Sequence, residues 1–221
     1  YFAPNIKVQF EDIETSSDAS SLLKKQEGNY FDTLFYYSLS LDKRNQSFQP
    51  TDGFISTFNQ SLPILSDTGT FINGYTITNY AEITEDFVTS ISFYVKASNS
   101  LTDEDVKISD RIILPPKRLR GFQYGKIGPK DGGDYIGGNY ASTLNFATTL
   151  PNIIPDIQNA DVKFFVDLAN VWGVDYSDTL AESNKIRSST GVGVDWWTPL
   201  GPLTFSFSQA ISKADTDKTE T

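Results

Sequence analysis

Few residues of this chain have the types and spacing that bond-making or bond-breaking chemistry requires. His and Cys are both absent, which removes a histidine general base, a cysteine nucleophile and the usual transition-metal ligands. The acidic run at 103–105 could hold paired carboxylates, but it lies in a charged stretch typical of a solvated loop. Gly125 and Gly128 lack the following Lys-Ser/Thr and the strand-to-helix context of a phosphate-binding loop. We therefore expect no enzyme activity, no metal site and no cofactor.

The composition is that of a folded, aromatic-rich and acidic chain. It has 221 residues, of which 38% are hydrophobic and 14% aromatic, and its net charge is −10. This aromatic content is too high for a disordered chain, and the negative charge argues against a protein that binds nucleic acid. The longest apolar run covers only residues 34–37, whereas a transmembrane helix needs about 20 apolar residues in succession. A membrane β-barrel stays compatible with the sequence, because its alternating strands dilute the hydropathy signal.

Apolar residues recur at every second position nearly everywhere along the chain. Phe164, Val166 and Leu168, for example, alternate with a register that holds Lys163 and Asp167. This period of two predicts strands with one apolar and one polar face. Strong strands are predicted at 35–42, 87–96, 162–169, 186–197 and 203–208, and weaker ones at 6–13, 54–62, 70–80 and 138–147. Only 19–25 is a candidate helix, so the predicted fold class is all-β with about nine antiparallel strands.

Periodicity alone leaves open what the apolar faces meet. They meet a protein core in a soluble β-sandwich, such as an adhesin or capsid domain, and lipid in a transmembrane β-barrel. Aromatic residues that cluster at strand ends, as in interfacial girdles, favour the barrel, and so does the long connection at about 98–137 beside tight turns. Mid-strand charges all fall on the polar register, where a wet lumen tolerates them: Lys96, Lys163, Asp167, Arg187 and Asp195.

Five motifs in a fixed order carry a family resemblance. The long connection contains Leu-Arg-Gly-Phe-Gln-Tyr-Gly-Lys-Ile-Gly-Pro-Lys at 119–130, followed by Gly-Gly-Asn at 137–139. Phe-Val-Asp-Leu-Ala-Asn-Val-Trp stands at 165–172, Ile-Arg-Ser-Ser-Thr-Gly-Val-Gly-Val at 186–194 and Trp-Thr-Pro-Leu-Gly-Pro-Leu at 197–203. Together with the turn Gln-Pro-Thr-Asp-Gly at 49–53, the set resembles the C-terminal half of the barrel of the BamA family, the outer-membrane protein assembly factors. The resemblance covers about residues 38–221, and the first 37 residues match only by strand pattern.

The resemblance implies that residues 1–221 are the C-terminal portion of a bacterial outer-membrane β-barrel. Such a barrel has about 16 strands, of which this chain would hold about nine, with the final strand missing. The chain begins without Met and without a signal-peptide pattern. We therefore expect a processed chain or an excised piece.

The resemblance also implies a docking site for the long loop inside the barrel. Family members fold this loop into the lumen, so Arg120, Gly121 and Phe122 would form its tip and Asp167 would be the wall carboxylate that Arg120 contacts. The planar guanidinium of arginine suits a bidentate contact with a carboxylate. Asp167 lies on the polar register of its strand, so its side chain is expected to face such a loop.

One position departs from the family pattern. The family commonly has an acidic residue on the preceding wall strand, where this chain has Asn145. An amide can hydrogen-bond but adds no charge. Arg120 is therefore expected to rest on Asp167 alone or to recruit Asp195.

The implied function is the folding and insertion of β-barrel proteins into the bacterial outer membrane. The implied partners are unfolded outer-membrane protein clients, accessory assembly lipoproteins, and the lipid and lipopolysaccharide of that membrane. A polypeptide-translocating pore of the two-partner secretion type is the alternative within the same superfamily, because it shares the Arg-Gly-Phe type of loop. A soluble β-sandwich adhesin or capsid domain is the second alternative.

Overall fold

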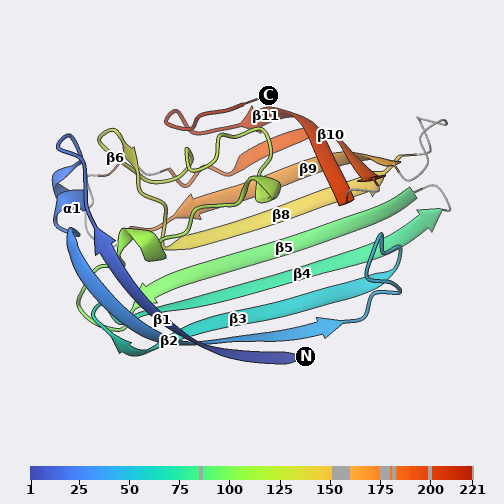
Figure 1. The fold of residues 1–221 in the computed structure, drawn as a ribbon. Helices are drawn as coiled ribbons and strands as arrows, with labels where there is room; N and C mark the ends of the chain where they lie inside the picture. Colours follow the sequence, from blue (N-terminus) through green and yellow to red (C-terminus); the bar gives the residue numbers. More distant parts are fainter. Residues whose placement is uncertain (85–86, 151–159, 175–179, 181–182, 199–200, 221) are drawn as a thin grey trace.

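The main feature of the computed structural model is one antiparallel sheet that curls into a trough (Figure 1). The structure describes residues 1–84, 87–150, 160–174, 180, 183–198 and 201–220. Within them the sheet has nine strands, and each strand pairs with its neighbours in chain order. The strands are β1 (Phe2–Ile13), β2 (Gly28–Asp42), β3 (Gly53–Ser66), β4 (Thr70–Thr84), β5 (Phe87–Ser100), β8 (Tyr140–Thr149), β9 (Ala160–Trp172), β10 (Arg187–Thr198) and β11 (Gly201–Ser212).

All nine predicted strands are present, which confirms the all-β fold class. Several strands extend beyond their alternating segments; β2 begins at Gly28 and β4 continues to Thr84. Backbone pairing continues past the apolar band, because ladder hydrogen bonds do not depend on side-chain polarity. The short connection between the strands predicted at 186–197 and 203–208 is one of the expected tight turns, and it includes residues 199–200, which lie outside the described part of the chain.

The sheet has an apolar outer face. The register aligns Phe93 on β5 with Leu144 on β8 and then with Leu168 on β9, so apolar side chains continue from strand to strand. On this face Ile6 is 66% exposed and Phe207 is 74% exposed. In the described residues the only other sheet is the two-stranded β6–β7 (Lys130–Asp131 and Asp134–Tyr135), so no second sheet covers this face and the sandwich alternative is wrong. The outer face is the lipid-facing surface of a transmembrane β-barrel wall. No helix among the described residues is long and apolar enough to cross a membrane.

The buried core lies on the opposite, concave side, between the sheet and the connection from β5 to β8. This connection, residues 101–139, contains two short 3₁₀ helices, η1 (Ile108–Asp110) and η2 (Pro116–Arg118), and the β6–β7 hairpin. Figure 1 shows it lying inside the trough. Its apolar side chains pack against small and aliphatic residues of the wall. The connection contributes Ile112, Leu114, Leu119, Phe122 and Ile127, and the wall contributes Ala141, Ala169 and Val171. The loop that was predicted at about 98–137 is thus an internal loop with its own core.

The connection between β1 and β2 carries the helix α1 (Ser21–Lys24), inside the predicted segment 19–25. The side chain of Ser20 caps it by accepting a hydrogen bond from the backbone of Leu23. The helix lies at the same end of the trough as the β6–β7 hairpin (Figure 1). This end therefore carries the larger loops, whereas residues 67–69 between β3 and β4 are a short exception.

Candidate functional site

The local backbone turns two arginines of the internal loop toward the barrel wall. Pro116 opens η2, and Leu119 follows it in an extended conformation. In an extended segment alternate residues point the same way, so Arg118 and Arg120 contact the wall while Leu119 is buried in the core. The next residue, Gly121, has a φ of +82°, which favours glycine. A Cβ there would approach Oγ of Ser208 on β11 to 3.1 Å, so the backbone runs close to the wall.

Arg120 forms a bidentate ion pair with Asp167 of β9. Its Nε donates to Oδ2 of Asp167 at 2.7 Å and its Nη2 donates to Oδ1 at 2.7 Å. The backbone N–H of Arg120 donates to the same Oδ2 at 3.1 Å. Asp167 is fully buried and Arg120 is 24% exposed. The guanidinium also lies 3.3 Å from the centroid of the Phe165 ring, so it is held by a carboxylate on one side and an aromatic face on another.

Asn145 of β8 completes the coordination of this carboxylate. Its amide nitrogen donates to Oδ1 of Asp167 at 2.8 Å and to the carbonyl oxygen of Arg118 at 2.8 Å. Its amide oxygen accepts from the hydroxyl of Thr143 at 3.1 Å. Asp167 thus accepts four hydrogen bonds, which satisfies a buried carboxylate. The amide does what a second carboxylate could not, because it donates both to Asp167 and to the loop backbone.

The ion pair of Arg120 is with Asp167, and Asp195 makes no direct hydrogen bond or ion pair with Arg120, although the Arg120 charge acts on Asp195 at longer range. Asp195 accepts from Lys163 at 2.8 Å and from Thr204 at 2.8 Å. The reason is its position along β10. Asp167 stands opposite Ser189, and Asp195 lies six residues farther along the strand, where Lys163 and Thr204 hydrogen-bond to it. Its nearest opposite charge is Lys163.

Arg118 is a wall contact that the sequence reasoning missed. Its guanidinium donates to Ser92 on β5 at 3.1 Å and to Thr76 on β4 at 3.4 Å, and it lies 4.6 Å from the Tyr94 ring centroid. Burial lowers the pKa of Arg118, yet a guanidinium stays charged at physiological pH. The Arg-Leu-Arg alternation at 118–120 was the available signal. The two arginines together span the wall from β4 to β9.

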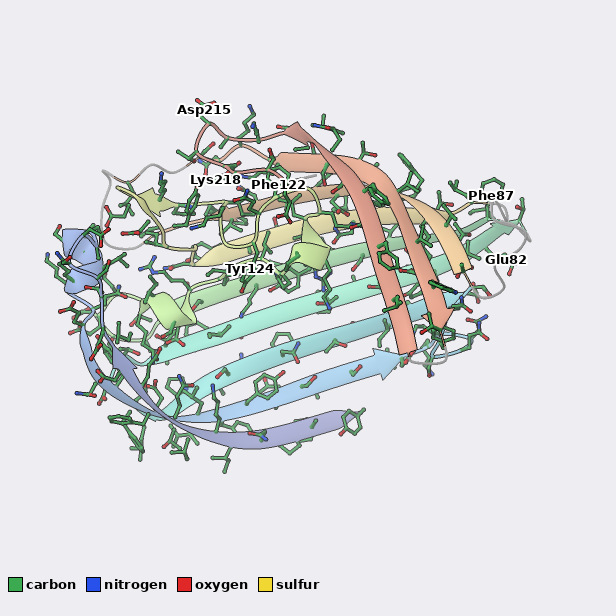
Figure 2. The ribbon with its side chains drawn as sticks, turned by 45° about the horizontal axis from the view of Figure 1, so that its top comes forward. Glu82, Phe87, Phe122, Tyr124, Asp215 and Lys218 are labelled. Atoms are coloured by element: carbon green, nitrogen blue, oxygen red, sulfur yellow. The ribbon has the colours of Figure 1, made fainter. Side chains whose placement is uncertain are left out.

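Phe122 anchors the loop tip in the core. It is 3% exposed and packs with the core cluster of the loop and wall. It also forms an antiparallel bridge with Thr219, a residue of the segment that follows β11. Figure 2 shows Phe122 beside Lys218 of that segment, whereas Tyr124 lies farther toward the middle of the trough. Ion pairs, hydrogen bonds and apolar packing thus attach the loop tip to the barrel wall.

Comparison with known proteins places this wall and loop in a family. The Omp85 superfamily domain matches residues 3–221. The chain belongs to the Omp85 superfamily. Its fold is that of a BamA-type outer-membrane barrel wall.

Named relatives of this Omp85 chain agree with that placement. The outer membrane protein assembly factor BamA of Neorickettsia risticii (strain Illinois) is 26% identical over 215 residues, which are 95% of this chain and 29% of that protein. The sorting and assembly machinery component 50 homolog of Homo sapiens is 31% identical over 204 residues, 81% of this chain and 41% of that protein. The chain thus spans less than half the length of these relatives.

A solved structure supports the fold. A crystal structure of BamA from Haemophilus ducreyi lacking POTRA domains 1–3 matches with a TM-score of 0.78 at 24% sequence identity. The match covers 87% of this chain and 41% of that chain. The trough therefore corresponds in shape to part of the wall of that barrel.

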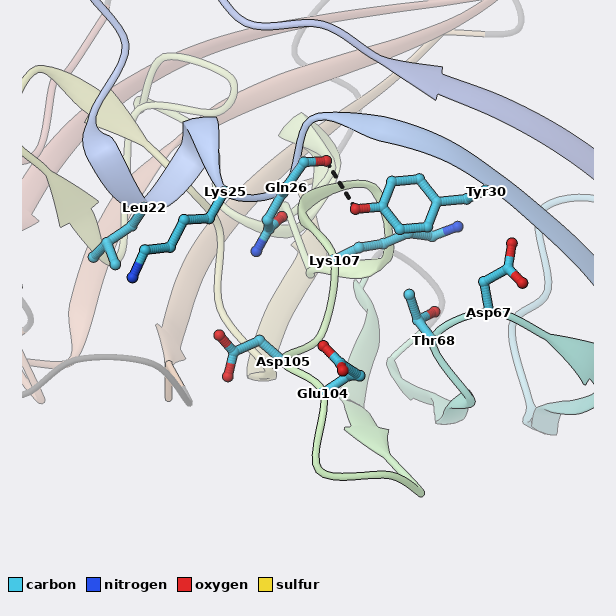
Figure 3. A pocket seen from close by; sticks show the side chains of 9 residues that line it. All are labelled: Leu22, Lys25, Gln26, Tyr30, Asp67, Thr68, Glu104, Asp105 and Lys107. Atoms are coloured by element: carbon cyan, nitrogen blue, oxygen red, sulfur yellow. Dashed lines mark hydrogen bonds between the residues drawn. The ribbon is translucent and has the colours of Figure 1, made fainter.

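The Omp85 loop has a further anchor near its start that the sequence reasoning also missed. Lys107 is 2% exposed, and its ammonium lies 2.6 Å from Asp32 on β2, 3.0 Å from Glu11 on β1 and 3.9 Å from Asp110. Figure 3 shows Lys107 extended alongside Tyr30, at the edge of a cavity of about 300 Å³. This anchor ties the loop to the hairpin of β1 and β2.

The electrostatics of this anchor follow from one ammonium among several carboxylates. Burial alone would lower the pKa of Lys107, but its hydrogen bonds to Asp32 and Glu11 and the nearby charge of Asp110 raise that pKa overall. The pKa of Asp110 is raised overall, because burial raises it by more than the nearby charge of Lys107 lowers it. Lys107 stands among other charges at 103–110, and no sequence pattern distinguished it.

Proposed function

We propose that the protein containing this chain folds and inserts β-barrel proteins into the bacterial outer membrane, without bond chemistry of its own. The observation that carries the proposal is the seating of Arg120 on the buried Asp167, from a loop that lies inside a barrel wall with an apolar outer face. The names of two relatives, an outer membrane protein assembly factor and a sorting and assembly machinery component, support it. The bacterial assignment is favoured by the wider match, which is 95% of the chain for the bacterial relative against 81% for the human one.

In this proposal the chain supplies part of the barrel wall and the internal loop that supports it. Client proteins in an unfolded state would add strands to an exposed sheet edge elsewhere in the barrel, because an unpaired edge is a template for pairing. The internal loop would hold the wall in shape while that edge opens. Accessory lipoproteins would bind at the barrel rim, and lipid and lipopolysaccharide would contact the outer face.

The test is an assembly assay with the complete polypeptide that contains residues 1–221, reconstituted in liposomes of outer-membrane lipid. A small urea-unfolded barrel protein serves as client, and its folded, heat-modifiable form is measured over time on a gel. Arg120→Ala removes both charge-assisted hydrogen bonds to Asp167, so we expect the folding rate to fall about tenfold or more. Arg120→Lys keeps the charge but not the planar fork, so its rate should be intermediate.

The matched control is Lys117→Ala, which removes one positive charge from the same 3₁₀ helix and should leave the rate unchanged because Lys117 is exposed. A wild-type rate for Arg120→Ala would contradict the bracing role. Absence of client insertion by the wild type, with an unfolded polypeptide instead becoming protected inside the liposomes, would favour the two-partner secretion alternative.

A further inference from the structure

The segment that follows β11 is bound to the tip of the internal loop. We call residues 214–220 the strap. The backbone N–H of Gln123 donates to the carbonyl oxygen of Lys218 at 3.0 Å, and that of Glu220 donates to the carbonyl oxygen of Gly121 at 3.1 Å. These bonds flank the bridge between Phe122 and Thr219. The strap therefore extends the loop tip by a short antiparallel pairing.

Two more contacts fix the strap along the loop. The backbone N–H of Lys218 donates to the carbonyl oxygen of Lys126 at 3.0 Å. The hydroxyl of Tyr135, in the β6–β7 hairpin, donates to the carbonyl oxygen of Thr216. These two contacts, like the pairing beside Phe122, use strap backbone groups. Their formation therefore depends on the strap's conformation more than on its side-chain types.

That conformation is held by a side chain of the barrel wall. Arg187 of β10 donates from Nε to Oδ2 of Asp217 at 2.9 Å and from Nη2 to Oδ1 at 3.1 Å. Both side chains are fully buried. Asp217 also accepts from the backbone N–H of Ala214 at 2.7 Å, and its own N–H donates to the carbonyl oxygen of Ala214 at 3.1 Å. The carboxylate thus closes a tight turn at the start of the strap and ties that turn to β10.

The remaining contacts of Arg187 fix its own direction. Its Nη1 donates to the side-chain oxygen of Asn170 on β9 and to the carbonyl oxygens of Ser183 and Lys185, both at 3.3 Å. Every terminal nitrogen of the guanidinium therefore has a partner on either the wall or the strap. Among the residues that the structure describes, Arg187 makes no direct hydrogen bond to the internal loop, and Asp217 links it to the strap.

We propose that Arg187 is a positioning residue for the proposed assembly function: through Asp217 it holds the strap against residues 121–126 and so keeps the loop tip seated. This inference rests on the proposed function for its biological consequence, but the positional claim stands on the contacts alone. A chain of contacts runs from β10 through Asp217 to the strap backbone and then to Gly121, next to Arg120. The tip is therefore clamped from β9 directly and from β10 indirectly.

The test measures position and assembly separately in the complete polypeptide that contains residues 1–221. Hydrogen–deuterium exchange is followed in peptides covering 119–127 and 214–220, with peptides of β3 and β4 as the internal reference. Arg187→Ala should speed exchange about tenfold or more in the first two segments and leave β3 and β4 unchanged, because the lost hydrogen bonds involve a charged group. The liposome assay should show a slower folding rate for the client.

Three variants make the result specific. Asp217→Asn keeps the shape of the strap side chain and should reproduce the increase even if Arg187→Ala folds poorly. Arg187→Lys retains the charge without the fork and should restore part of the protection. Lys163→Ala removes a different wall ion pair, the one with Asp195, and should leave the strap and tip unchanged.

Unchanged exchange at 119–127 in Arg187→Ala and Asp217→Asn would overturn the positional claim, whatever the assembly rate. An equal rise in β3 and β4 would also overturn it, because it would indicate a general loss of stability. Raised exchange at the tip with an unchanged assembly rate would reject a role in assembly. Failure of the wild type to assemble clients would reject the proposed function instead, and the exchange measurements would still decide the position of the tip.

Discussion

Two arginine–aspartate pairs hold the loop tip of this Omp85 barrel wall, and they are built in opposite directions. In the first pair the loop supplies the cation, Arg120, and the wall supplies the anion, Asp167. In the second pair the wall supplies the cation, Arg187, and the strap supplies the anion, Asp217. Both pairs are bidentate, so their geometry does not distinguish them. Their burial does.

Because the two pairs differ in burial, breaking them has different energetic costs. Arg120 is 24% exposed while docked, so it can turn to water if the loop leaves the wall. Arg187 is fully buried beneath the strap and can be hydrated only if the strap moves away. A buried charge without a partner is costly, whereas a charge that reaches water is not. The Arg120 pair is thus suited to reversible docking, and the Arg187 pair to a permanent attachment.

The largest predicted effect comes from removing each acidic partner in turn. Asp217→Ala leaves Arg187 buried without its carboxylate, so the free energy of unfolding should fall by about 3–5 kcal/mol. Asp167→Ala should lower it by about 1–3 kcal/mol, because Arg120 can be hydrated. Urea unfolding of the complete polypeptide in lipid, followed by tryptophan fluorescence, measures both values. Equal losses, or a larger loss for Asp167→Ala, would contradict the comparison.

The second prediction concerns the aromatic platform under Arg120. A Cβ at Gly191 would lie 2.1 Å from the carbonyl oxygen of Phe207 and 2.6 Å from Cζ of Phe165, the ring on which Arg120 stacks. Gly191→Ala should therefore displace the ring and lower the free energy of unfolding by about 1–3 kcal/mol.

Gly193, on the same face of β10, is the matched control for that change. A Cβ there would meet the carbonyl oxygen of Phe205 at 3.5 Å, which is an ordinary contact. Gly193→Ala should change the free energy of unfolding by less than about 0.5 kcal/mol. If the two alanine variants were equally stable in urea, the Phe165 ring would not depend on the gap at Gly191.

The strands were predictable because alternation is a local property of the sequence. Each strand's apolar and polar registers could be read without knowing its neighbours, and the structure places these registers on the outer and inner faces. Strand ends were less predictable, since β2 starts at Gly28 although its alternation begins near residue 35. At these ends pairing with a neighbouring strand, which no local pattern records, decides the structure.

The contacts of the site divide in the same way. Asp167 could be placed on the inner face from its register, and its contact with Arg120 was expected from the family resemblance. The link between Arg187 and Asp217 could not be predicted, although Arg187 stood out as a charge on the polar register. Asp217 lies in the strap, after the end of β11, so only the three-dimensional path of the strap brings Asp217 to Arg187. Asn145 could be expected to hydrogen-bond, but not to bridge Asp167 and the loop backbone.

The smallest predicted effect sharpens the comparison by adding a lysine anchor to the two arginine pairs. The pKa of Lys107 is raised above its ordinary value of about 10.5, so its stabilising charge is fully present below that pH and is lost as pH rises through the raised value. The groups that face it are Asp32, Glu11, Asp110 and the Tyr30 ring. The two anchors of the loop tip use guanidinium groups, a type of side chain that does not lose its proton in proteins. At high pH the start of the loop should therefore loosen before its tip.

Two single-cysteine variants of this Cys-free chain can measure that order, Glu104→Cys beside Lys107 and Lys117→Cys beside the arginines, each labelled with an environment-sensitive fluorophore. The dye at 104 should change its emission with a midpoint above about pH 10.5, and the dye at 117 should not change over this range. Adding Lys107→Arg should abolish the transition at 104. Because Tyr30 is unchanged in that variant, the loss would assign the transition to the Lys107 ammonium and not to the Tyr30 phenol. Simultaneous transitions at both dyes would mean that the loop moves as one rigid unit and that its anchors do not open separately.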